Sequence, residues 1–269
     1  MVNELQKRVR NKLHRFFADN FARRPFFMAA PRPYISFTFD DFPRSAFLNG
    51  SCLLSKYAVR GTFFVSMGLL NTESSSGRIA TLNDLHNLLR EGHEIGCHTF
   101  DHRDGWSTSP AAFERSVKKN RRAFNDAFPT EYLEVFAYPL NGPKLKVKRI
   151  IGKKFLCCRG GGQGFNRKLI DLNLLKAFFL DWRNQDNFAL VRQLIDENNA
   201  AHGWLIFATH DISTEPSKYG CTPDFFESIV RYAAQSGACI LPVAKICQEL
   251  DIISYEKSTT SAREGTLML

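Results

Sequence analysis

Short runs of β-forming residues alternate along the chain with segments whose hydrophobic residues have helical spacing. The runs that predict strands are YISFTF at 34–39, RGTFFV at 60–65, EIGC at 94–97, LEVFAY at 133–138, KAFFL at 176–180, WLIFAT at 204–209 and ACILPV at 238–243. Helical patterns cover 110–127, 186–200 and 223–236. This alternation is typical of an α/β fold with a mostly parallel sheet, and about seven parallel strands favour a distorted (β/α) barrel.

The first two dozen residues follow a different pattern, with hydrophobic residues at steps of three and four and basic residues between them. The hydrophobic positions are Leu5, Val9, Leu13, Phe16, Phe17 and Phe21, and the basic ones are Lys7, Arg8, Arg10, Lys12, Arg15, Arg23 and Arg24. This period predicts a basic amphipathic helix within residues 1–30. Such a helix could dock on its own domain, lie on an anionic membrane surface or bind nucleic acid.

Between this helix and a polar tail we expect one catalytic-size domain, over residues 31–253. No internal repeat and no Pro/Gly-rich linker divides this stretch, and a chain of 269 residues is long enough to bury a sizeable core. The tail, residues 254–269, is polar and has no hydrophobic period, so we expect it to be mobile.

Composition narrows the class of protein further. Hydrophobic residues make up 44% of the chain, which excludes a disordered or fibrous protein. The seven cysteines are an odd number without a CxxC pair, which favours reduced thiols over a disulfide framework or a zinc ribbon. No apolar run approaches the ~18 residues of a membrane span, and the opening residues lack the apolar core of a secretory signal. We therefore expect a cytoplasmic protein, with peripheral contact at the inner membrane surface through residues 1–24 as one alternative.

Two polar clusters directly follow predicted strands. Asp40 and Asp41 end the YISFTF run, and His98 and His102 follow EIGC within HTFDH. On a helical turn, a spacing of four places two imidazoles on one face. Ligands bind at the carboxyl edge of parallel strands, so we expect the two clusters to converge there. Aspartate and two histidines form a common ligand set for zinc or another divalent ion, and the second aspartate would be available as a base.

These residues carry a resemblance to a known family. TFDD at 38–41 and HTFDH at 98–102 resemble the first two motifs of the polysaccharide deacetylases, the NodB-homology family known as carbohydrate esterase family 4. The resemblance implies a NodB-type barrel, with Asp40 as the catalytic base. It also implies one divalent metal ion, zinc by preference, on Asp41, His98 and His102.

Three later stretches follow in the family's order, so that the likeness spans roughly residues 34–250. FAYPLNG at 136–142 is similar to the third motif, which implies an oxyanion site at the Leu140 backbone with Tyr138 beside the substrate. LDWRNQD at 180–186 resembles the fourth, in which Asp181 would orient the catalytic histidine and Trp182 would form a wall of the groove. ATHD at 208–211 resembles the fifth, with His210 as general acid.

Two positions depart from the family pattern. The third motif usually carries an arginine that pairs with the catalytic aspartate, and Ala137 occupies that position here. Either Arg159, in the run CCRGGGQGFN, contacts Asp40 and substrate in its place, or Asp40 is tuned differently and Arg159 is a surface loop residue. Ala208 replaces the leucine that usually packs against the acyl methyl group, which leaves acetyl and formyl both open as the group removed.

The resemblance implies a metal-dependent hydrolase of linear C–N (amide) bonds that removes an N-acyl group from an amino sugar. We expect a nucleotide-linked, lipid-linked or oligosaccharide precursor of bacterial surface polysaccharide. The alternatives are a metal-dependent amidase that acts on a non-sugar amide, and a non-catalytic protein that binds carbohydrate or a membrane surface. Retention of all the metal and acid–base residues argues against the second alternative. No basic strip interleaved with aromatics surrounds the site, so we do not expect nucleic acid as a partner.

Overall fold

The structure is a computed structural model that describes residues 12–13, 16–140, 142–185 and 187–252. The predicted tail at 254–269 and the first eleven residues of the predicted N-terminal helix lie outside the described residues. Within the described part, no helix has the length and hydropathy that a membrane crossing requires.

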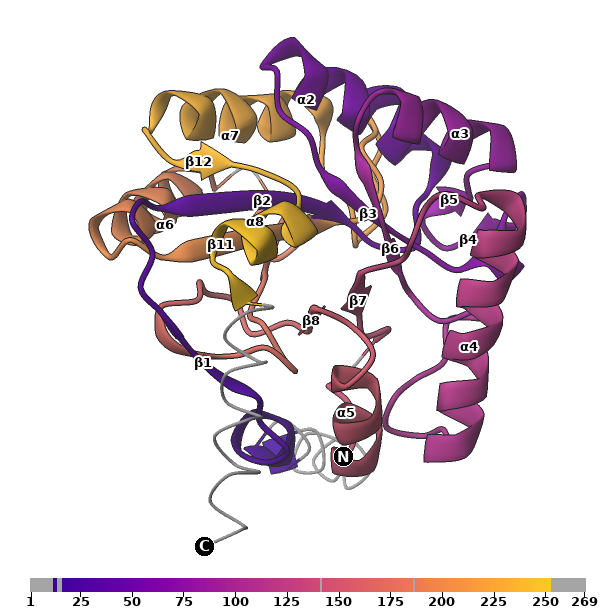
Figure 1. Ribbon diagram of the computed structural model, residues 1–269. Coiled ribbons are helices and arrows are strands. Elements are labelled where there is room, and N and C mark those ends of the chain that lie inside the picture. Colours follow the sequence, from indigo (N-terminus) through magenta and orange to yellow (C-terminus); the bar gives the residue numbers. More distant parts are fainter. Residues whose placement is uncertain (1–11, 14–15, 141, 186, 253–269) are drawn as a thin grey trace, which may run out of the picture.

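A curved parallel sheet forms the centre of the fold (Figure 1). Its strands follow the spatial order β10 (Phe178–Phe179), β11 (Trp204–Thr209), β2 (Tyr34–Phe39), β3 (Thr62–Val65), β6 (Glu94–Cys97), β7 (Val135–Ala137) and β8 (Cys157–Arg159). The short β12 (Cys239–Ile240) pairs with the first two residues of β2. Seven parallel strands along one path confirm the predicted distorted barrel.

The two ends of this path are joined by an irregular segment. The Leu175 N–H donates to the Cys158 carbonyl at 2.8 Å, and the Gly160 N–H donates to the Leu175 carbonyl at 2.9 Å. Leu175 lies just before β10, so β8 is hydrogen-bonded to the stretch that leads into the opposite end of the sheet. The barrel is therefore closed between β8 and β10 by loop backbone and not by a regular ladder.

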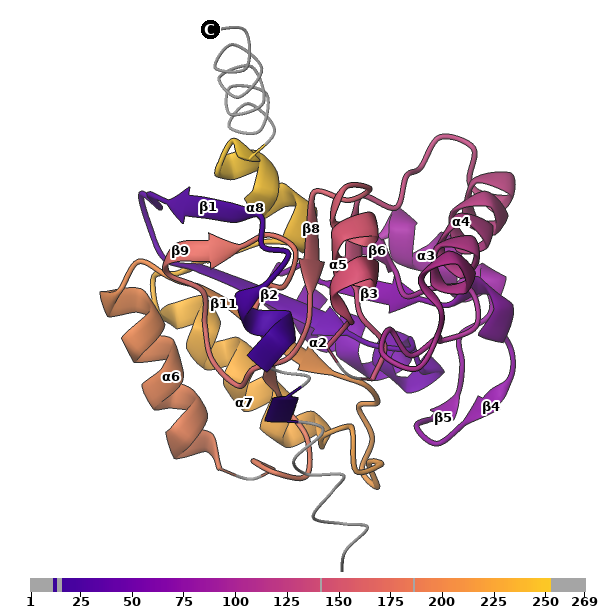
Figure 2. The same ribbon diagram turned by 90° about the horizontal axis from the view of Figure 1, so that it is seen from below.

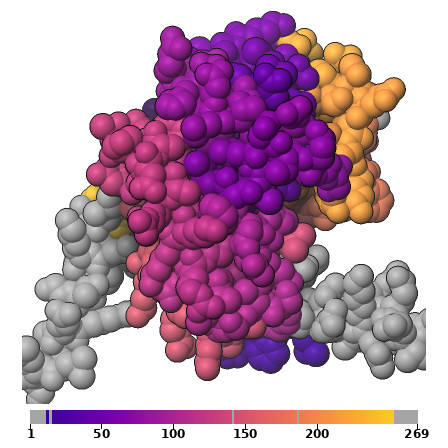
Figure 3. All heavy atoms as spheres, turned by 90° about the vertical axis from the view of Figure 1, so that its right-hand side faces the viewer, coloured from indigo at the N-terminus to yellow at the C-terminus, as the bar shows by residue number. Residues whose placement is uncertain are grey.

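Helices surround the sheet (Figures 1 and 2). They are α2 (Cys52–Lys56), α3 (Leu82–Arg90), α4 (Pro110–Ala127), α5 (Leu145–Gly152), α6 (Phe188–Ala200), α7 (Pro223–Gln235) and α8 (Val243–Glu249), with a π-helical turn at Ala46–Ser51 and a 3-10 turn at Met67–Leu69. In the space-filling view of Figure 3, segments from the first half of the chain cover most of the face seen. A small antiparallel hairpin of β4 (Glu73–Ser74) and β5 (Gly77–Arg78) precedes α3.

The three predicted helices begin where their sequences provide caps. The side chains of Ser109, Asn187 and Thr222 each accept a hydrogen bond from a backbone N–H in the first turn of α4, α6 and α7. Proline follows Ser109 and Thr222 directly, at a position where its missing N–H costs nothing. These caps explain why the helix starts could be predicted closely.

The central strands β2 and β11 are buried at every residue. Parallel strands covered on both faces show continuous hydrophobic runs in place of alternation, as YISFTF and WLIFAT do. Ile35, Phe37 and Phe39 of β2 pack toward the outer helices, whereas Tyr34 belongs to a second cluster with Trp204 and Ile246 of α8. The core therefore lies on both sides of one sheet.

The N-terminal segment differs from the prediction. Residues 16–20 are helical, but Pro25–Met28 form β1, which pairs antiparallel with β9 (Lys168–Asp171). A helix that continues to residue 30 is therefore wrong. The helix ends just before Ala22, whose φ of 52° is left-handed, and Pro25 has no N–H with which a helix could continue past it.

Strand β8 is the other departure from the predicted pattern. The glycines of CCRGGGQGFN favour a loop, but the first three residues of this run form a buried strand that pairs in parallel with β7. Three residues followed by three glycines give too short a run for the periodic pattern to detect.

The buried His93 makes the stability of the fold depend on pH. It is buried, and its Nδ1 accepts a hydrogen bond from the Gly61 N–H at 3.0 Å. Burial lowers the pKa of His93 to about 4. In the unfolded chain His93 has its ordinary pKa of about 6.5, so below pH 6.5 the unfolded state binds a proton that the folded state does not. The free energy of unfolding therefore decreases as the pH falls from 6.5 toward 4. We expect His93→Asn, which keeps an acceptor near Gly61, to flatten the fall of melting temperature over this interval.

The matched control is His86→Asn, because His86 is an exposed histidine of the preceding helix α3. Thermal unfolding of both variants between pH 4 and 7 checks the prediction. A His93→Asn profile as steep as that of the wild type would contradict it.

Candidate metal-dependent active site

The predicted site residues follow the ends of neighbouring strands. The Asp40 N–H donates to the Thr209 carbonyl at 2.8 Å, and β2 and β11 pair in register along six residues. This pairing brings Asp40 and Asp41 beside His210. His98 follows β6, and its N–H donates to the Val65 carbonyl at the end of the intervening strand β3. The clusters therefore converge at one edge of the barrel, as predicted.

Asp41, His98 and His102 form the group of potential metal ligands found among the described residues. Their ligand atoms all lie within 4.8 Å of one another. The Asp41 Oδ1 atom is 3.4 Å from His98 Nε2 and 3.1 Å from His102 Nε2. Ligands held tetrahedrally at about 2.0–2.1 Å from one ion are separated by about 3.3 Å, so these spacings fit a divalent metal.

The hydrogen bonds around His98 support the same conclusion. His98 Nδ1 lies 2.9 Å from the Ala137 carbonyl, which can only accept, so Nδ1 carries the proton. The unprotonated Nε2 then faces Asp41 Oδ1, a buried oxygen that accepts no hydrogen bond from the described residues. A lone pair facing a carboxylate oxygen requires a cation between them, and burial of polar atoms without one is costly.

A loop brings the two histidines together, whereas their spacing of four suggested a helical turn. Residues 98–103 are irregular, and both Thr99 and His102 have positive φ angles, of 63° and 52°. Asp41 is also left-handed, with φ of 60°. Residues other than glycine lose about 1–2 kcal/mol in this conformation. Such strain is typical of functional sites that the surrounding fold holds in place.

Arg159 forms a buried ion pair with Asp40. Its guanidinium lies between the rings of Phe64 and Phe179, and Nη1 donates to the Gly160 carbonyl at 3.0 Å. Ala137 and Arg159 are direct partners in the β7–β8 register. The cation absent at Ala137 is therefore supplied from the adjacent strand, and the alternative of a surface loop residue is wrong.

This ion pair controls the charge of Asp40. Burial acts to raise the pKa of the Asp40 carboxyl, but the Arg159 charge, with His98 and His210, outweighs it and lowers that pKa below its usual value. Burial likewise opposes ionisation of Asp41, whose pKa the surrounding imidazoles hold well below its usual range. Burial and the neighbouring His98 lower the pKa of His102, which favours its neutral, ligating form.

Asp181 does not contact His210 as predicted. Its carboxylate accepts hydrogen bonds from Arg183 Nε at 2.9 and 3.0 Å and from Arg183 Nη2 at 2.5 Å. His210 Nδ1 is buried and has no hydrogen-bond partner among the described residues. Arg183, two residues further along the chain, binds the Asp181 carboxylate in place of His210. A guanidinium is a strong partner for a carboxylate because it donates through two N–H groups.

The rim of the site combines the predicted Trp182 with the loop that carries Lys218 and Tyr219. The Trp182 side chain is exposed, and the Trp182 backbone N–H donates to the Lys218 carbonyl at 3.3 Å. The Tyr219 ring lies 5.3 Å from the His210 ring. Asp211 holds this loop by accepting from the Ser217 hydroxyl at 2.6 Å and the Ser217 N–H at 2.7 Å. Trp182 is therefore placed to line a groove, and Tyr219 covers one side of His210.

The third motif divides into an exposed and a buried part. Leu140 is left-handed, with φ of 61°, and 70% of it is exposed. Its N–H donates no hydrogen bond to any described residue, so it is available to an oxyanion. Tyr138 is buried in the core, with its ring 4.9 Å from that of Phe136. The predicted substrate contact of Tyr138 is therefore not supported, since its ring packs below the surface.

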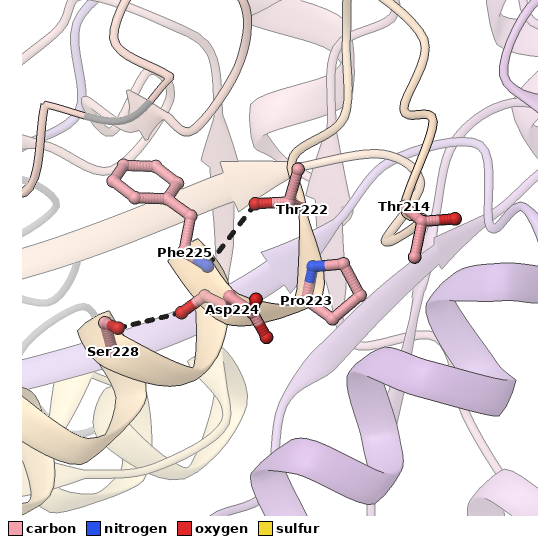
Figure 4. A pocket seen from close by; sticks show the side chains of 6 residues that line it. All are labelled: Thr214, Thr222, Pro223, Asp224, Phe225 and Ser228. Atoms are coloured by element: carbon pink, nitrogen blue, oxygen red, sulfur yellow. Dashed lines mark hydrogen bonds between the residues drawn. The ribbon is translucent and has the colours of Figure 1, made fainter.

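An open pocket lies apart from these residues, at the first turn of α7 (Figure 4). It is lined by Thr214, Thr222, Pro223, Asp224, Phe225 and Ser228. Thr222 accepts from the Phe225 N–H, and Ser228 donates to the Asp224 carbonyl, so these polar groups serve the helix itself. The pocket contains none of the predicted site residues.

Comparison with known proteins shows a likeness to one family. Residues 28–153, slightly less than half of the chain, match the family model described as polysaccharide deacetylase. The matched region contains Asp40, Asp41, His98 and His102, whereas His210 lies beyond it. A search of curated proteins finds no match.

Solved structures of similar fold include members of the CE4 family. The Xyl-CE4 domain of a multidomain xylanase from the hindgut metagenome of Trinervitermes trinervoides is 16% identical, with a TM-score of 0.56 over 81% of this chain and 91% of that one. A peptidoglycan deacetylase from Bacillus subtilis is 15% identical, with a TM-score of 0.55 over 87% of this chain and 98% of that one. A CE4 family pseudoenzyme from Bacillus anthracis is 13% identical, with a TM-score of 0.56 over 81% and 66%. These likenesses show the polysaccharide deacetylase fold.

The ion pair between Arg159 and Asp40 gives a testable prediction. Arg159→Ala would leave the buried Asp40 carboxylate without its partner, at a cost of about 3–5 kcal/mol. It would also free Asp40 to move, and a shift of about 1 Å can reduce turnover about 10²-fold. We expect lower thermal stability and lower kcat, with metal content unchanged.

Two variants separate this role from general damage. Arg167→Ala removes an exposed arginine eight residues along the chain and should change neither quantity. Arg159→Ala combined with Ala137→Arg restores a cation on the paired residue of β7 and should recover part of the activity. Full activity in Arg159→Ala alone would show that the ion pair has no part in positioning Asp40.

Proposed function

We propose that this protein is a metal-dependent deacylase that removes an N-acetyl or N-formyl group from an amino sugar. The observation that carries the proposal is the convergence of Asp40, Asp41, His98, His102 and His210 at one strand edge. The match to the polysaccharide deacetylase model supports the coarser class, a hydrolase of the deacetylase type. Because a pseudoenzyme shares the fold, the residues of the site and not the fold support activity.

Asp41, His98 and His102 would hold the ion, with zinc as the proposed metal because two imidazoles and one carboxylate are typical zinc ligands. When bound, a divalent ion polarises the amide carbonyl and lowers the pKa of a water molecule. The Ala137 carbonyl orients His98 through Nδ1, so that Nε2 faces Asp41.

Asp40 would act as the general base. Its ion pair with Arg159 keeps the carboxylate ionised and fixes its position beside Asp41. In that position it can accept the proton of the attacking water. The Leu140 N–H would donate to the oxygen that gains charge as the carbonyl carbon becomes tetrahedral. A single donor of this kind is typically worth about 3 kcal/mol in the transition state.

His210 would act as the general acid. Its Nε2 lies 3.9 Å from Asp41 Oδ2, so this nitrogen faces the reacting centre and would carry the donated proton. Protonation of the sugar nitrogen lets it leave as a neutral amine, because an expelled amide anion is far too basic. The Tyr219 ring restricts water on one side of the imidazole. A carboxylate and a free amino sugar are the products.

The substrate would lie against the exposed Trp182, whose indole can stack on a sugar ring. Ala208, fully buried at the end of β11, takes less space than the leucine usual in the family. We therefore keep both acetyl and formyl as the group removed. A nucleotide-linked or lipid-linked precursor of surface polysaccharide remains our proposed substrate class.

Metal analysis combined with activity tests this proposal. Protein purified without chelator should contain about one zinc or similar ion per chain, the stoichiometry of a single three-ligand site. His98→Ala should lose both the metal and amine release from a panel of N-acetylated and N-formylated sugars. Asp40→Asn should keep the metal and lose about 10²–10⁴-fold in rate, the usual share of a general base.

His86→Ala is the matched control, because it removes an exposed histidine from α3 and should change neither metal nor rate. Wild-type protein that takes up no metal even after supplementation would sink the ligand assignment. Metal binding without release from any sugar would favour a binding protein or an amidase with another substrate.

A further inference from the structure

We propose that the N-terminal helix presents an aromatic surface that binds an anionic phospholipid bilayer beside the catalytic opening. Docking of this helix on its own domain was one of the alternatives from the sequence, and the structure shows such docking. The contacts that achieve it leave the phenylalanine face of the helix uncovered.

Buried side chains of the barrel hold the backbone of the N-terminal segment. Lys148 of α5 is fully buried, and its ammonium donates to the Ala18 carbonyl at 2.5 Å and to the Phe21 carbonyl at 3.0 Å. The same ammonium pairs with Asp171 of β9 at 2.6 Å. Asn173 donates to the Ala22 carbonyl at 2.9 Å. Docking therefore depends on carbonyl groups at the end of the helix and on the small, buried Ala18.

The large hydrophobic side chains of the helix remain at the surface. Phe16 is 56% exposed, Phe17 39% and Phe21 47%, and Leu13 is similarly exposed. The three rings pack on one another, with centroids 5.7–6.5 Å apart. A helix whose function ended at docking would bury this face, because apolar burial is the main stabilising contribution of an amphipathic helix. Clustered exposed aromatics indicate an interaction surface.

This surface borders the catalytic opening. Ala18 lies close to Gly142, such that a Cβ on Gly142 would come within 3.3 Å of the Ala18 methyl group. Gly142 is two residues from Leu140, the exposed residue of the proposed oxyanion site. Figure 2 shows the N-terminal segment beside α5, which follows the same loop. A bilayer in contact with the aromatic surface would therefore lie next to the active site.

Charge selects the partner. Residues 1–24 contain seven basic side chains and two acidic ones, so they supply more than half of the net charge of +9. A second copy of this chain would bring like charges together. Nucleic acid would leave the phenylalanine cluster without an apolar partner. Anionic phospholipid matches both the positive charge and the exposed phenylalanine rings. Basic residues bind its headgroups, and aromatic rings enter the membrane interface.

If the proposed function holds, this surface favours an N-acyl amino sugar that is attached to a lipid carrier. The sugar of such a substrate would stand at the headgroup level, where the opening beside Leu140 lies. This consequence rests on the proposed deacylase activity, whereas bilayer binding itself does not.

Vesicle binding of the full chain tests the surface. We expect wild-type protein to sediment with vesicles of phosphatidylglycerol and phosphatidylcholine, and to bind pure phosphatidylcholine far more weakly. A triple variant that carries Phe16→Ser, Phe17→Ser and Phe21→Ser should bind the anionic vesicles at least about tenfold more weakly. Loss of even one buried phenyl group is expected to have an effect of this size. Phe27→Ser is the matched control, because Phe27 is 62% exposed on β1, outside the helix, and should bind like wild type.

Three outcomes would overturn the proposal: equal binding to both vesicle types, binding unchanged in the triple variant, or a wild-type dimer in light scattering that the triple variant abolishes. Retention on duplex DNA without vesicle binding would also overturn it. Activity on a soluble N-acyl sugar, measured in parallel, keeps the two proposals apart. Vesicle binding without that activity refutes the deacylase alone, and activity without vesicle binding refutes the surface alone.

Discussion

The buried ion pair between Asp40 and Arg159 is the interaction on which the centre of this site depends. A carboxylate at the end of a fully buried strand is unfavourable unless a cation lies beside it. Arg159 reaches that position because β8 lies in the sheet and the barrel closes next to it, through the backbone bonds between Cys158, Gly160 and Leu175. Closure of the barrel and ionisation of the proposed base are therefore linked.

The same constraint shapes the neighbouring histidine cluster. His98 directs its unprotonated Nε2 at Asp41 Oδ1, and His102 Nε2 lies 3.1 Å from the same oxygen, which accepts no hydrogen bond from the described residues. The loops that achieve this contain residues in left-handed conformations, including Asp41 and His102 themselves. The extensive β2–β11 pairing and the buried hydrophobic residues on both faces of the sheet supply the stability that holds such loops.

Small differences in partner choice distinguish this chain from the general family pattern. The cation that pairs with Asp40 is Arg159 of β8, whereas the resemblance places it at position 137 of β7, which is alanine here. Asp181 binds Arg183 and does not orient His210 as expected. His210 instead contacts Tyr219 from the loop that Asp211 holds. Both carboxylates pair with an arginine, Asp40 with Arg159 of β8 and Asp181 with Arg183. A fold shared with a pseudoenzyme therefore says less about activity than these contacts do.

The sequence by itself determined the strands that carry the chemistry and the caps that start the main helices. YISFTF, EIGC and WLIFAT could be recognised because continuous β-forming runs specify buried parallel strands, and the polar residues after them had to meet at one sheet edge. Only the tertiary structure decided the partners. Arg159 contacts Asp40 through the register of β8, a strand too short to show a period, and Arg183 occupies Asp181 through side-chain geometry that spacing does not encode. The exposure of Phe16, Phe17 and Phe21 likewise follows from where Lys148 holds the backbone, because an amphipathic pattern shows that a helix has an apolar face but not what covers it.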